Sequence, residues 1–102
     1  TPAEGVVREA LEETGLVCEP ISMVGVFDSR LCDTVDAHHL YHFVFLCRPT
    51  GGNLGQGSTP QEVLDVKWFD EDNLPDSLDP SHVKRIAVSF QVSHGKTEAF
   101  FD

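Results

Sequence analysis

The sequence has few basic residues. Lys and Arg number 7 against 17 Asp and Glu, which gives a formal net charge of −10. This balance argues against non-specific binding to nucleic acid or to an anionic membrane, because both require a basic surface. If the ligand is itself an anion, a divalent cation would have to offset the repulsion. The plain alternative is that an acidic surface keeps a small protein in solution.

Long apolar runs and cysteine clusters are also missing. No apolar stretch approaches the roughly 20 residues of a membrane-spanning helix, and the first residues lack the basic and apolar regions of a signal peptide. The cysteines are three in number and widely spaced: Cys18, Cys32 and Cys47. They predict neither a disulfide framework nor a zinc site, and they favour a reducing cytoplasm.

The chain does have the composition of a packed domain. Hydrophobic residues make up 40% of 102 residues, which is long enough for one domain and too short for two. A helix is predicted over Thr1–Thr14. Thr1 can cap it, Pro2 suits its first position and Gly15 is a natural stop.

Strands, loops and a second helix are predicted for the rest of the chain. The strand candidates are Ile21–Phe27, His39–Cys47, Val63–Phe69 and Lys96–Phe101. His39–Cys47 is apolar at successive positions, as in a strand covered on both sides. The connections are expected at 28–37 and at Pro49–Pro60, whose glycines lack the Walker Lys-Ser/Thr ending of a phosphate cradle. A short helical turn is expected at Glu71–Leu74, and a second helix at Ser81–Val92 with Ser81 as its cap.

Three carboxylates share one side of the first helix. Arg8 to Leu16 reads REALEETGL. At about 100° per residue, Glu9 and Glu13 fall within roughly 40° of each other, with Glu12 about 60° beyond Glu9. These like charges repel, and a hard divalent cation with oxygen ligands would remove the repulsion. Arg8 is placed to pair with Glu12. On charge pattern alone, a solvated acidic face is the commoner explanation.

The whole string resembles the second half of the Nudix box. That signature reads Gly, five residues, Glu, seven residues, Arg-Glu, an aliphatic, any residue, Glu-Glu, any residue, Gly, an aliphatic. Here the matching residues are Arg8, Glu9, Ala10, Glu12, Glu13, Gly15 and Leu16. The resemblance implies a Nudix-type α/β/α sandwich with a mixed β-sheet, and a single Nudix domain over 1–102. The box's first Glu would fall immediately before Thr1, so we expect an N-terminally truncated domain without its first strands and with exposed strand edges.

The resemblance also implies roles for individual residues. Glu12 and Glu13 would be ligands of Mg²⁺, with Mn²⁺ as an alternative metal. Glu9 would be a further ligand or a base that orients the attacking water, and Arg8 would hold the glutamates in place. Glu62 stands where many family members place an extra metal-binding or basic Glu; an ordinary surface Glu is the equal alternative. The box does not identify the general base.

Other candidates are weaker. His38, His39 and His42 form a dense patch, for which core or surface histidines are the favoured explanation over a metal site. Arg30 can contact phosphate or be a solvated loop residue. Trp68 and Phe69 can stack on a base, although such a pair at a strand end is usually core.

The function implied by the resemblance is a Mg²⁺-dependent pyrophosphohydrolase. It would cleave a nucleoside diphosphate linked to another moiety (ADP-ribose-like, sugar nucleotide or nucleoside triphosphate) to a nucleoside monophosphate. The alternative is a non-catalytic, nucleotide-binding regulatory module. An isomerase of the isopentenyl-diphosphate type would need a catalytic Cys and metal-binding His residues that the sequence does not identify. A small-molecule substrate is expected rather than a membrane or a nucleic acid polymer, and a homodimer stays open.

Overall fold

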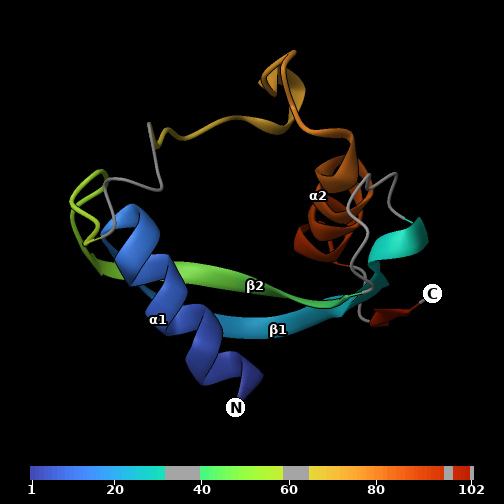
Figure 1. Cartoon of the computed structure of the whole chain (residues 1–102), viewed down its shortest axis with the longest axis horizontal. Coiled ribbons are helices and arrows are strands. Elements are labelled where there is room, and N and C mark those ends of the chain that lie inside the picture. The colour runs from blue at the N-terminus through green and yellow to red at the C-terminus, as the bar shows by residue number, and fades with distance from the viewer. Residues whose placement is uncertain (32–39, 59–64, 96–97, 102) are drawn as a thin grey trace. The chain divides into compact units, whose positions relative to one another are not determined.

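The computed structural model describes residues 1–31, 40–58, 65–95 and 98–101. Its elements, in chain order, are α1 (Pro2–Thr14), β1 (Leu16–Asp28), the 3₁₀ helix η1 (Ser29–Leu31), β2 (Tyr41–Gly52), the 3₁₀ helix η2 (Glu71–Asn73), α2 (Pro80–Ser93) and β3 (Phe100–Phe101) (Figure 1). The chain divides into two compact units. The first comprises Thr1–Ile21 and Cys47–Trp68, and the second comprises Ser22–Leu46 and Phe69–Asp102.

The strands that the structure describes form a mixed sheet in the order β2-β1-β3. β1 and β3 are parallel, with Gly25 opposite Phe100. β1 and β2 are antiparallel: near one end the Arg48 side chain bonds Glu19, and at the other end the Ser29 N–H donates to the Leu40 carbonyl. Helices and a mixed sheet make the α/β class that the sequence predicts.

Helix α1 has the ends that local sequence signals predict. The Thr1 hydroxyl accepts from the Glu4 N–H at 3.2 Å, and Pro2 follows in the first turn. Gly15 ends the helix in the left-handed conformation, at φ 83°, and its N–H donates to the Leu11 carbonyl at 3.0 Å. A residue with a side chain would be strained at that φ, so Gly15 both ends the helix and turns the chain into β1.

Gly5 lies inside α1, where glycine is unfavourable because the unfolded chain gains more freedom than with any other residue. A Cβ added at Gly5 would meet no atom within 4 Å. We therefore expect Gly5→Ala to raise the free energy of unfolding by about 0.5–1 kcal/mol, measured by urea denaturation at neutral pH. An unchanged or lower stability would show that this face of α1 has a packing partner.

The strands differ from the predictions at their ends and in their exposure. β1 begins at Leu16 rather than at Ile21, and β2 continues through Pro49 to Gly52, where a loop was expected. Pro49 is tolerated because β2 is an edge strand of the described sheet and need not donate at every position. The prediction that this strand is covered on both sides is wrong, since no residue of β2 is buried. Aromatic residues favour strands whether or not both faces are covered.

The predicted strand Val63–Phe69 is also wrong over its described part. Residues 65–69 have no strand pairing, and the side chains of Trp68 and Phe69 are 68% and 47% exposed. A strand requires a neighbour to complete its hydrogen bonds, and none of the described strands pairs with this segment. The expected helical turn does form, as η2.

Helix α2 is capped two positions earlier than the predicted Ser81. The Asp79 carboxylate, and not Ser81, is the cap: Oδ1 accepts from the Ser81 N–H at 2.9 Å and from the Ser81 hydroxyl at 2.8 Å. Pro80 then occupies the first helical position, where a missing N–H is harmless. The helix ends at Ser93, one residue beyond the predicted Val92.

The core lies in the second unit. Val24 and Phe27 are fully buried, and Val88 of α2 is 8% exposed. Phe27 stacks on Phe100 with ring centroids 4.8 Å apart. A Cβ on Gly25 would collide with the backbone of Phe100, so the absence of a side chain at Gly25 lets β3 pair with β1.

None of the helices in the described ranges is long and apolar enough to cross a membrane. Cys18 and Cys47 are free thiols, and Cys32 lies outside the described residues.

Candidate functional site

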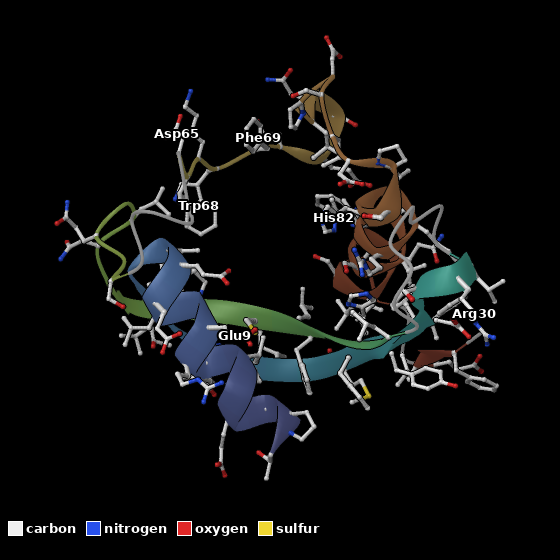
Figure 2. All side chains as sticks on the ribbon, in the orientation of Figure 1. Glu9, Arg30, Asp65, Trp68, Phe69 and His82 are labelled. Atoms are coloured by element: carbon white, nitrogen blue, oxygen red, sulfur yellow. The ribbon has the colours of Figure 1, made fainter. Side chains whose placement is uncertain are left out.

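The three predicted carboxylates lie on α1. Glu12 and Glu13 belong to its last turn, and Glu9 lies one turn earlier (Figure 2 labels Glu9). Glu9 and Glu13 are exposed, and the Glu12 side chain is half-buried. The predicted ion pair is present: Arg8 Nε lies 3.9 Å from Glu12 Oε1. A pair this long between two largely solvated side chains stabilises a helix little.

This arrangement is unfavourable for the helix itself. The C-terminal end of a helix carries a partial negative charge, and α1 has two carboxylates and no basic residue in its last turn. Glu9 and Glu13 add repulsion at i, i+4. Local rules that are broken together in one short segment are typical of functional sites. A cation placed among these carboxylates would reverse the sign of each unfavourable contribution.

The donor chemistry of these carboxylates suits a hard divalent cation that takes most of its ligands from outside the protein. Among the described residues, no group of three or more His, Cys, Asp and Glu is gathered closely enough to hold a metal by itself. Mg²⁺ usually takes only one or two protein carboxylates and fills its octahedron with water and phosphate oxygens. The carboxylates of α1 suit that mode. Glu62, the other predicted ligand, lies outside the described residues.

A glycine-rich segment closes the C-terminal end of α1. We call residues 53–58 the glycine loop. Its N–H groups donate to three carbonyls at the end of the helix: Ser58 N–H to Glu12 at 2.8 Å, Gly55 N–H to Thr14 at 2.8 Å, and Asn53 N–H to Gly15 at 3.0 Å. Carbonyls of the last turn have no partner within the helix. The sequence predicts the loop, but nothing in it identifies α1 as the surface that the loop contacts.

Arg30 is engaged by a neighbour. Its Nε and Nη2 atoms donate to Oδ1 and Oδ2 of Asp28 at 3.1 and 2.7 Å (Figure 2 labels Arg30). The hydrogen bonds and the charge of Asp28 raise the pKa of Arg30. The Asp28 carboxylate is buried, and the bidentate contact with the Arg30 guanidinium neutralises its charge. This argues against a phosphate contact for Arg30, which is exposed, as the alternative expected, but lies in η1 and is paired with Asp28 rather than free in a loop.

The aromatic and histidine candidates differ in their exposure. Trp68 and Phe69 are exposed and hence are not core, contrary to the alternative that the sequence favoured. His42 is partly buried on β2, and His38 and His39 lie outside the described residues.

The sequence analysis did not single out Arg85 of α2, whose side chain is only 8% exposed. Its Nη2 atom lies 2.6 Å from His82 Nδ1. A guanidinium only donates, so Nδ1 of His82 is the acceptor.

The environment of His42 predicts a pH-dependent stability. Burial, and then the charges of Arg85 and His82, lower the pKa of His42 below its ordinary 6.5. As the pH falls, His42 is therefore protonated in the unfolded chain before it is protonated in the folded protein. The contribution of His42 to the free energy of unfolding is constant above about pH 6.5 and decreases below it. We expect His42→Gln to flatten this loss in urea titrations between about pH 7 and pH 5. An identical slope in the variant would assign the loss to other groups.

A small pocket lies in the second unit. It has a volume of about 230 Å³ and is lined by Val26, Asp28, Leu31, Tyr41 and Phe101. It contains none of the residues that the sequence singled out for catalysis.

Comparison with known proteins identifies the class to which this helix and sheet belong. The sequence profile of the NUDIX domain matches residues 1–88, and the chain therefore belongs to the Nudix family. The fold agrees: the crystal structure of a UDP-X diphosphatase superposes with a TM-score of 0.83 at 26% sequence identity, covering 100% of this chain and 49% of that one. The α/β Nudix fold predicted from the residues of α1 is confirmed.

Two of the similar proteins are named for a particular activity. The 8-oxo-dGDP phosphatase NUDT18 of Mus musculus is 34% identical over 94 residues, which cover 88% of this chain and 27% of the relative. The ADP-ribose pyrophosphatase of Methanocaldococcus jannaschii is 39% identical over 75 residues, or 74% of this chain and 41% of the relative. The chain thus spans less than half of the length of each of these two relatives.

Proposed function

We propose that this chain forms part of a metal-dependent pyrophosphohydrolase that cleaves a nucleoside diphosphate linked to another moiety. The observation that carries the proposal is the placement of Glu9, Glu12 and Glu13 on α1 of a Nudix domain, where their charges are unfavourable without a cation. The products would be a nucleoside monophosphate and the phosphorylated second moiety. That 1–102 belongs to a single domain stays a prediction.

The relatives support the substrate class. They are named for 8-oxo-dGDP, for ADP-ribose and, in the solved structure, for UDP-X. The shared chemical feature is a nucleoside diphosphate, which varies in its base and in what its terminal phosphate carries. We infer that the enzyme recognises the diphosphate. We therefore expect nucleoside triphosphates to be poorer substrates than nucleoside diphosphate compounds.

The residues of α1 have separate roles in this proposal. Glu12 and Glu13 would bind Mg²⁺, or Mn²⁺ in its place, and the ion would neutralise phosphate charge and lower the pKa of a bound water. Glu9 would be a third carboxylate for the metal or would orient the attacking water, and Arg8 would restrict Glu12. Glu62 would supply a further carboxylate. Water adds to one phosphorus, the bridging P–O bond breaks, and the departing phosphate oxygen receives a proton.

A substrate screen of the full-length protein tests the proposal. ADP-ribose, CDP-choline, sugar nucleotides and nucleoside triphosphates would be incubated with Mg²⁺, with and without EDTA, and the products separated by ion-exchange chromatography. We expect a monophosphate that appears only with metal. Nucleotide binding without turnover of any compound would instead favour the non-catalytic regulatory module. A cytoplasmic location and a homodimer stay predictions.

A further inference from the structure

The contact between the glycine loop and α1 reaches the backbone of the two glutamates that the proposed function assigns to the metal. We propose that the glycine loop is a positioning element for Glu12 and Glu13, and that Gly57 is its decisive residue. This inference rests on the proposed function, because it concerns how the same carboxylates are held. Gly57 and Ser58 touch no substrate in this proposal; they act through the helix.

The hydrogen bonds show that the loop holds the last turn of α1 at successive points. Ser58 N–H donates to the Glu12 carbonyl, and Gly55 N–H to the Thr14 carbonyl, each at 2.8 Å. The Glu12 and Glu13 side chains leave the backbone at the same turn. An N–H aimed at each carbonyl also places a positive partial charge against the negative end of the helix. The loop thereby offsets part of the unfavourable field at the carboxylates.

The space at Gly57 shows how close the contact is. A Cβ added there would collide with the Glu12 carbonyl oxygen and lie 2.9 Å from the carbonyl carbon and oxygen of Glu13. Real Cβ atoms do not approach backbone atoms so closely, and backbone cannot swing aside as a side chain can. Gly57 does not have a left-handed φ. The requirement for glycine therefore comes from its distance to α1 and not from a turn conformation.

A shift of this turn would matter because metal sites tolerate little displacement. Mg²⁺ demands a nearly ideal octahedron with oxygens at about 2.0–2.1 Å, and a site that is loose by about 0.5 Å loses function. Adding a methyl group at Gly57 must push the carbonyls of Glu12 and Glu13 away or move the loop. Either movement displaces the two carboxylates relative to each other and to Glu9.

The chain offers a matched control at Gly51, at the end of β2. A Cβ there would lie 3.9 Å from the Val17 Cβ, an ordinary contact, and Gly51 also has no left-handed φ. Gly57→Ala and Gly51→Ala thus add the same methyl group to nearby positions of the chain. At Gly57 it meets the backbone of the box glutamates, and at Gly51 it meets one side chain at an ordinary van der Waals distance.

The experiment compares four full-length proteins: the wild type, Gly57→Ala, Gly51→Ala and Glu12→Gln. Mn²⁺ binding is measured from the EPR signal of the free ion, and kcat and KM are measured with Mg²⁺. Circular dichroism and thermal melts select a temperature at which every variant is folded. We expect Gly57→Ala to weaken Mn²⁺ binding on the order of tenfold to a hundredfold, and to lower kcat more than it raises KM. Gly51→Ala should match the wild type in both.

The outcomes separate the two proposals. One outcome overturns only the role of the loop: Gly57→Ala is folded and matches the wild type in Mn²⁺ binding and in catalysis, while Glu12→Gln is impaired in both. Absence of Mn²⁺ binding in the wild type overturns both. If Gly57→Ala does not fold, Ser58→Pro is tested in its place, because it removes the N–H that donates to the Glu12 carbonyl. Weakened Mn²⁺ binding in the folded Ser58→Pro variant supports the proposal. Mn²⁺ binding equal to that of the wild type overturns it.

Discussion

Replacing Glu12 or Glu13 with Gln is expected to lower kcat/KM by at least about a hundredfold, because a bound metal supplies several kcal/mol of stabilisation to the transition state. Gln keeps the size of Glu and loses only the charge. The same substitutions should leave the unfolding temperature in metal-free buffer unchanged or raise it, since they remove charge from the negative end of α1. Activity and stability would move in opposite directions, as is typical of a functional residue.

Glu4→Gln is the matched control. Glu4 is exposed in the first turn of α1, where the helix favours a negative charge. Its replacement should leave kcat/KM within about twofold, and it should lower rather than raise helix stability by a few tenths of a kcal/mol. Steady-state kinetics and thermal melts with EDTA measure both quantities. Full activity in Glu12→Gln and Glu13→Gln would remove these residues from the metal site.

Phe27→Ala is expected to lower the free energy of unfolding by about 3–5 kcal/mol. Phe27 is fully buried beside Val24 and Val88, and its ring stacks on Phe100 at 4.8 Å. Truncation removes the buried apolar surface and leaves a cavity between β1, β3 and α2, which the paired backbone of β1 and β3 prevents from closing. Urea denaturation of the full-length protein, followed by circular dichroism, measures the change.

Phe101→Ala is the corresponding surface change, one residue along from Phe100. The Phe101 side chain is 80% exposed, so its loss should alter stability by no more than about 0.5 kcal/mol. Equal effects of the two truncations would show that the core of the second unit is not centred on Phe27.

The first helix was predictable to its ends because every signal that forms it is local. Thr1, Pro2 and Gly15 act on atoms within four residues of themselves. The acidic motif is local too: its helical spacing places the three carboxylates on one side before any tertiary structure is known. The candidate site could therefore be predicted as far as α1 extends.

The mispredicted strand and the unforeseen contact of the glycine loop depend on partners elsewhere in the chain, whereas the cap of α2 was a wrong choice between two local candidates. Asp65–Phe69 has strand-forming residues, but no described strand pairs with it. The Ser81 hydroxyl is a good cap in isolation, but Pro80 before it fixes the first helical position and leaves capping to Asp79. The contact of Gly57 with the Glu12 and Glu13 backbone joins segments far apart in sequence. The glycines predict a loop there, and they give no indication of what the loop contacts.

The three hydrogen bonds from the glycine loop to α1 fix the length of the loop as well as its composition. Each N–H meets its own carbonyl, and the order along the loop runs opposite to the order along the helix end. Inserting or deleting one residue between Asn53 and Ser58 would move every later donor off its acceptor. Natural length variation in this part of the family should therefore fall outside 53–58, while side chains that point away from the helix within the loop remain free to diverge.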